Sequence, residues 1–127
     1  MNVNGQAAGA QLERSATLQN AVSANGNGTT LTLAPSDDQI TLKTTGASTP
    51  IFTVTFEVSW DNGSTWLNAF LEDLLNASVG TFINVLTNPS AAYHRYRVAP
   101  GVTSVRARIA SYVSGTGTVT AVVRGRR

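Results

Sequence analysis

The sequence predicts an all-β protein, a single antiparallel β-sandwich of jelly-roll type with about eight to nine strands. The clearest evidence is the run Ile51–Trp60, in which apolar and polar residues alternate. A period of two places one set of side chains on a buried sheet face and the other set in water. The residues Asp61–Ser64 then supply a turn, and Thr65–Phe70 returns as the partner strand of a β-hairpin. Turn residues also recur every 8–12 residues or so along most of the chain, as in sandwich proteins.

The chain before this hairpin begins with a segment that has little to bury. Residues 1–13 carry only Val3 and Leu12 as larger apolar side chains, so we expect a flexible N-terminal arm followed by a sandwich domain over residues 14–127. The expected strands here are Ser15–Val22, Thr29–Leu33 and Gln39–Thr44, with turns at Ala24–Gly28 and Pro35–Asp38 and a loop at Thr45–Pro50.

The chain after the hairpin continues the pattern with one ambiguous stretch. Leu71–Leu75 fits either one helical turn or the end of a strand. The expected strands are Thr81–Thr87, Tyr93–Val98, Thr103–Val113 and Thr118–Arg124, with turns at Asn88–Ser90, Pro100–Gly101 and Ser114–Gly117. The alternation predicts a core built from Phe52, Val54, Phe56, Val58, Trp60, Val105, Ala107, Ile109, Val113, Val119, Ala121 and Val123.

The composition limits the possible classes of protein. A chain of 127 residues suits one domain. The absence of cysteine excludes a disulfide framework, a thiolate metal site and a cysteine nucleophile. No segment approaches the roughly 20 apolar residues of a membrane span, so we expect no membrane partner. Charged residues make up only 13% of the chain, and Thr, Ser, Asn and Gly supply the polar surface instead.

The charges are distributed unevenly along the chain. All seven acidic residues lie at or before Asp73, and seven arginines follow it. The strand pattern places Arg95 with Arg97, and Arg106 with Arg108, on one face of their respective strands. Two interpretations remain open: these arginines neutralise acids on neighbouring strands, or they form a basic contact face for an acidic protein partner. Arg95, Arg97, Arg106 and Arg108 are therefore candidate partner-binding residues. Nucleic-acid binding is disfavoured, because few aromatic residues stand between the arginines.

No residue pattern indicates catalysis, a metal ion or a cofactor. His94 is the only histidine and stands in a predicted strand, where a structural role is expected. The pairs Asp37–Asp38 and Asp61–Asn62 fit turns better than a calcium site, which needs six to eight oxygens. The adjacent acids Glu72 and Asp73 point to opposite faces of a strand, unlike the opposed carboxyls of a glycosidase. We therefore expect no enzyme activity.

Trp66 is a further candidate contact residue, and with Trp60 it flanks the central turn as a possible sugar-stacking pair.

Three stretches resemble small structural proteins of tailed-bacteriophage particles. They are Leu18–Thr29, which reads LQNAVSANGNGT; Phe56–Trp66, which reads FEVSWDNGSTW; and Tyr96–Arg108 followed by Ser111–Thr116, which read YRVAPGVTSVRAR and SYVSGT. The resemblance spans residues 18 to 123. Pro100 departs from the pattern of these proteins, and the tail Arg124–Arg127 is not part of it.

The resemblance implies a virion structural protein without enzyme activity. We expect a capsid decoration (cement) protein that binds across capsomers, at the surface of the head or at the head–tail region. Its expected partners are the major capsid protein or other virion proteins and further copies of itself, as a homotrimer. Such attachment is multivalent, because symmetry repeats each contact. The alternative is a receptor- or carbohydrate-binding module of a tail fibre, which an exposed Trp66 beside Asp61 and Asn62 would favour.

Overall fold

The computed structural model describes residues 13–74, 82–89 and 91–125. Nine strands lie in these ranges and pair into one antiparallel sheet, which confirms the predicted all-β sandwich. This part of the chain holds no helix long and apolar enough to cross a membrane. The strands are β1 (Glu13–Val22), β2 (Leu31–Thr32), β3 (Asp37–Ser59), β4 (Leu67–Asn68), β5 (Leu71–Asp73), β6 (Phe82–Ile83), β7 (Leu86–Thr87), β8 (Ala91–Arg97) and β9 (Ser104–Gly125).

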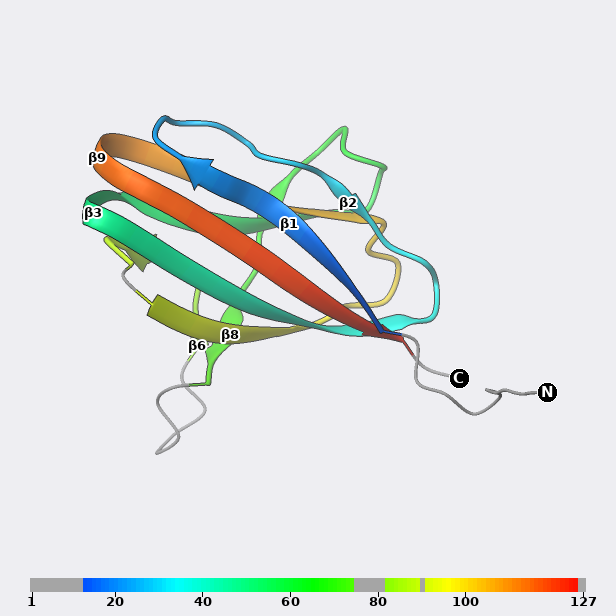
Figure 1. The fold of residues 1–127 in the computed structure, drawn as a ribbon. Coiled ribbons are helices and arrows are strands. Elements are labelled where there is room, and N and C mark those ends of the chain that lie inside the picture. The colour runs from blue at the N-terminus through cyan, green and yellow to red at the C-terminus, as the bar shows by residue number, and fades with distance from the viewer. Residues whose placement is uncertain (1–12, 75–81, 90, 126–127) are drawn as a thin grey trace.

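The sheet folds over on itself into two layers, because β3 and β9 each run through both of them (Figure 1). The first layer has the order β1, β9, β3, β8, β5, β6 and uses the beginning of β3 and the end of β9. The second layer pairs residues 53–59 of β3 with residues 104–110 of β9. Strand β2 extends this second layer beside β9, and β4 and β7 extend it beside β3.

The long strands replace a loop and a turn in the prediction. We expected a loop at Thr45–Pro50 and a tight turn at Ser114–Gly117, but these segments lie within β3 and β9, and the ladder between the two strands resumes beyond the unpaired residues 48–50. The register shifts between Ala47 and Ile51, and positive φ angles occur at Thr49 (56°) and Gly115 (88°). Extra residues and left-handed backbone bend a strand without ending it, which is how strands turn the corner of a sandwich. Small and polar residues at such a corner read as a loop in the sequence.

The core lies between the two layers and follows the predicted alternation. Phe56 is 2% exposed and its ring lies 5.6 Å from that of Tyr96 across the layers. Two predicted core residues are wrong: Trp60 is 45% exposed and Val113 is 68% exposed. Trp60 follows the end of β3, and Val113 lies beyond a bulge at Ser111 (φ 53°), where the register shifts and the alternation changes phase. The buried members include Phe52, Val54, Phe56, Val58, Val105, Ala107, Ile109, Val119, Ala121 and Val123.

Two further segments differ from the prediction in detail. Leu71–Asp73 forms strand β5 beside β8, which resolves the ambiguity of that stretch in favour of a strand. The expected strand Thr81–Thr87 is divided into β6 and β7, which pair in different layers. The expected arm covers residues 1–13, of which residues 1–12 lie outside the described residues and Glu13 belongs to β1.

Candidate functional site

Three of the five candidate contact residues meet on the outer face of the second layer. Glu57 of β3 stands opposite Arg106 of β9 in the ladder, and Arg108 follows on the same face. The Glu57 carboxylate accepts a hydrogen bond from Arg106 Nε at 2.7 Å and a longer one from Arg108 Nε at 3.3 Å. Glu57 was expected in water but is only 7% exposed, because the two arginine side chains lie over it.

Trp66 completes this group from the loop that follows β3. The Arg106 guanidinium lies over the Trp66 ring, with 4.2 Å between its central carbon and the ring centroid, in cation–π geometry. We call Glu57, Trp66, Arg106 and Arg108 the arginine–tryptophan cluster. Trp66 is half-buried within it, and the exposed tryptophan that would favour a tail-fibre module is not found at this position.

The Asp61 carboxylate helps to hold the loop that carries Trp66. Asp61 Oδ1 accepts hydrogen bonds from the Ser59 hydroxyl at 2.7 Å and from the Thr65 backbone N–H at 2.8 Å. These bonds, the Ser59 bond first, lower the pKa of the Asp61 carboxyl. Gly63 has φ of +92° and packs under the ring, since a Cβ there would lie 3.4 Å from Trp66. The turn predicted at Asp61–Ser64 therefore fixes the position of the Trp66 side chain.

The other two candidate residues lie on the outer face of the first layer. Arg95 of β8 donates two hydrogen bonds to Glu72 of β5, its cross-strand neighbour, at 2.8 and 2.5 Å. Arg97 is exposed and forms no ion pair with another described residue. Lys43 stands opposite Tyr93 in the same face, with its ammonium group 5.8 Å from the ring centroid.

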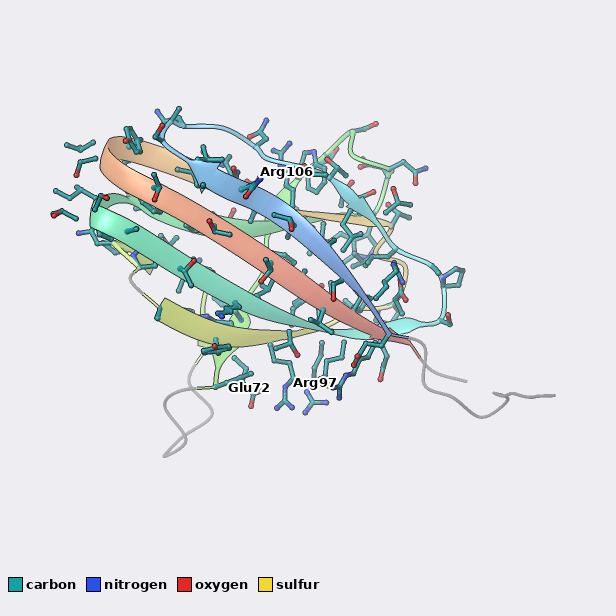
Figure 2. The ribbon with its side chains drawn as sticks, viewed as in Figure 1. Glu72, Arg97 and Arg106 are labelled. Atoms are coloured by element: carbon teal, nitrogen blue, oxygen red, sulfur yellow. The ribbon has the colours of Figure 1, made fainter. Side chains whose placement is uncertain are left out.

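The two pairs of arginines are thus on opposite sides of the sandwich. In Figure 2, Arg97 and Glu72 project beside β8 at the lower edge, whereas Arg106 lies near the top of the view. The structure therefore does not join Arg95, Arg97, Arg106 and Arg108 into one basic face. The alternation in β8 and β9 correctly predicts on which side of its strand each arginine lies. It does not predict which layer holds that part of the strand, because this depends on pairing between residues far apart in the sequence.

Neutralisation by acids on neighbouring strands is present on both faces. Glu57 and Glu72 are the partners of Arg106, Arg108 and Arg95, and Glu13 pairs with Arg124 at 2.8 Å. The arginines at 126 and 127 lie outside the described residues. The described residues include seven acidic and seven basic side chains, and the cations without an acid of their own in an ion pair are Arg97 and Lys43 on one face and Arg108 on the other.

The other acidic turn and the histidine have structural surroundings. The Asp37 carboxylate is bound by both terminal nitrogens of Arg14, at 2.9 and 2.8 Å, and by the Ala34 N–H at 2.7 Å. The Arg14 hydrogen bonds are the first cause of the lowered pKa of Asp37. His94 is buried on the inward face of β8, as expected of a structural histidine. Among the described residues, no three His, Asp or Glu side chains come together as metal ligands.

A cavity of about 360 Å³ lies at the end of the sandwich, between residues 33–38 and residues 98–103. Trp60 packs against the second segment, and its Nε1–H donates a 2.9 Å hydrogen bond to the Pro100 carbonyl. Its ring also packs on Gly101, where a Cβ would come within 3.1 Å of it. Trp60 is therefore an exposed but firmly held aromatic ring, which the sequence pattern had placed in the core.

The comparisons with known proteins identify the fold but no family. No protein-family model matches the chain, and no curated protein sequence matches it. Among solved structures, the SPBc2 prophage-derived protein YomS matches with a TM-score of 0.78 and 19% identity over 91% of this chain and 96% of that one. The PBSX exported protein XepA matches with a TM-score of 0.76 and 15% identity over 91% of this chain and 39% of that one. At these identities the likeness establishes a shared fold.

Proposed function

We propose that this protein is a structural component of a bacteriophage particle, without enzyme activity, and that it decorates the capsid by binding across capsomers. The observation that carries the proposal is the fold, which extends over nine-tenths of the chain in two phage-derived structural neighbours. The resemblance of three sequence stretches to structural proteins of tailed phages supports the same context.

The surface of the sandwich suits attachment to a repeating shell. The outer face of the second layer carries a partly exposed arginine, Arg108, beside the half-buried Trp66. A single exposed contact of this kind is weak. Several such contacts, repeated by symmetry in a homotrimer on the major capsid protein, give strong attachment through effective concentration.

Nucleic acid is a poorer partner for this surface. Binding a phosphate backbone takes a continuous positively charged groove with stacking aromatic residues. Here Arg97 and Arg108 are on opposite sides of the molecule, and both faces also carry carboxylates. We therefore propose virion proteins as the partners and the particle as the location of this protein.

Deletion of the gene from its phage tests the proposal. If the protein is a capsid decoration, particles that lack it lose DNA at a lower temperature than wild-type particles, and added purified protein restores their stability. As a control, the variant Phe56→Ala, which loses a buried core side chain, should restore less stability than the wild-type protein does. Particles that are equally heat-stable with and without the protein, but fail to adsorb to cells, would instead assign it to the tail.

The exposed Trp60 favours a second candidate function, that of a receptor- or carbohydrate-binding module of a tail fibre. An aromatic ring that is 45% exposed and fixed by Pro100 presents a flat apolar surface on which a sugar ring can stack. Purified protein applied to the cell-wall polysaccharide of its host tests this function. Retention that is lost on Trp60→Ala and kept on Leu67→Ala, a change at another exposed apolar residue, would support the module.

A further inference from the structure

We propose that the arginine–tryptophan cluster binds a single carboxylate, presented by an acidic side chain of the protein partner. The inference rests on the proposed attachment function and specifies the chemistry of one contact. It starts from the hydrogen bonds that the two arginines leave unused. Arg106 and Arg108 each bond Glu57 through Nε alone, and neither uses its terminal Nη groups on another described residue. Arginine recognises carboxylates through such parallel N–H groups.

The charges of the cluster leave room for a second carboxylate. Glu57 supplies one negative charge, and Arg106 and Arg108 supply two positive charges. Glu57 is already nearly inaccessible, so its charge is used inside the protein. The side chain of Arg108 is 40% exposed, compared with 16% for Arg106. Arg108 is therefore the group that a partner carboxylate reaches, with Arg106 behind it.

The cluster is also held in position before any partner arrives. Arg106 is fixed between the Glu57 carboxylate and the Trp66 ring, and Trp66 is fixed by the loop that Asp61 organises. A fixed group loses less conformational entropy on binding than a free surface arginine does. Arginine and tryptophan are also the residue types that dominate binding energy in protein interfaces. The combination distinguishes this cluster from Arg97, which has neither a stacking ring nor an ion-pair partner among the described residues.

The geometry fits one protein carboxylate better than a chain of phosphates. The surplus charge on this face is confined to one guanidinium, and Glu57 lies 3.3 Å from that guanidinium's Nε. A run of phosphates needs several cations in sequence along a groove.

The test uses the full-length protein, a glutamate-rich model peptide and a thymidine oligonucleotide of the same net charge. Binding of each probe is followed by NMR through the arginine Nε–Hε and tryptophan indole signals. We expect the peptide to shift the signals of Arg106, Arg108 and Trp66 and to leave that of Arg97 in place. Arg108→Gln should weaken peptide binding by roughly tenfold or more, the effect of losing a charge-assisted hydrogen bond. Arg97→Gln removes the same charge from the opposite face and should change the affinity less than about twofold.

The outcomes separate the alternatives. If Arg108→Lys binds as tightly as wild type, the planar guanidinium is not required and the proposal is wrong. Equal weakening by Arg97→Gln would show general attraction to a positive protein and would also overturn it. Tighter binding of the oligonucleotide than of the peptide would assign the cluster to phosphate instead. Thermal melts of both glutamine variants identify any loss of binding that is due to unfolding. If the peptide binds at Arg108 as expected but the protein is absent from phage particles, the carboxylate site is supported and the proposed function is wrong.

Discussion

Replacing Asp37 by Ala should destabilise the protein by about 2–3 kcal/mol, although Asp37 is not one of the proposed contact residues. The Asp37 side chain is 2% exposed and receives two hydrogen bonds from Arg14 and one from the Ala34 N–H. Removing one member of a buried ion pair costs about 3–5 kcal/mol when the other charge stays buried. The Arg14 side chain is 42% exposed and regains water, so we expect a value below that range.

Urea denaturation of the wild type and two variants measures this cost. The matched control is Glu13→Ala, which breaks the ion pair with Arg124 at the same end of the sheet. Both members of that pair are about half exposed, so its loss should cost less than about 1 kcal/mol. Equal losses for Asp37→Ala and Glu13→Ala would refute the reasoning, because burial would then not decide the strength of these pairs.

The same carboxylate predicts a dependence of stability on pH. Arg14 lowers the pKa of Asp37 in the folded protein, so its contribution is fully present above the unfolded pKa of about 3.9. The contribution is lost as the pH falls through the lower folded pKa. The stability difference between the wild type and Asp37→Asn should therefore be constant near neutral pH and shrink below about pH 4. A difference that grows in acid would contradict the sign of the shift.

Four further predictions concern the core, the bend, the arm and the oligomer. Phe56→Ala should cost about 3–5 kcal/mol in denaturant melts, and a loss below about 1 kcal/mol would mean that this face is not core. Gly115→Ala should cost about 2 kcal/mol, because φ is +88° and the new Cβ would meet the Ala47 carbonyl oxygen at 2.7 Å; an unchanged melting temperature would show that the bend is relaxed. Deleting residues 1–12 should leave the melting temperature nearly unchanged and weaken particle binding, whereas an unfolded product would make this segment part of the fold. Light scattering of the purified protein should give the mass of a trimer, and a monomer at all concentrations would remove the homotrimer from the proposal.

The strand positions and the inward face of most strands could be predicted from the sequence. Alternation over Ile51–Trp60 and Thr103–Val113 depends only on the local pleat, and it correctly assigned Phe56 and Ile109 to the core. It failed for Trp60, which lies beyond the end of β3, and for Val113, because the bulge at Ser111 in β9 shifts the phase of the alternation.

Which residues come together in the candidate site could not be predicted from the local alternation of apolar and polar residues. Arg97 and Arg108 each lie on the polar side of a strand, as predicted, but which layer holds each strand segment is set by pairing between distant residues. The bend that carries β3 and β9 from one layer into the other is made of residues that also form loops. Burial of Glu57 follows from the same pairing, because Arg106 stands opposite Glu57 in the ladder. The sequence does contain one signal for this burial. Glu57 is the one charged residue in the alternating stretch Ile51–Trp60, and a pair of arginines stands on another strand.

The most direct test of the central claim is quantitative mass spectrometry of purified particles, with heads and tails separated after washing in moderate salt. A capsid decoration protein should appear in the head fraction in a fixed ratio to the major capsid protein, and the ratio should fall as the salt concentration of the wash increases. Recovery of the protein only with tails would assign it to the tail module. Its absence from both fractions, with the protein free in the lysate, would contradict a structural role in the virion.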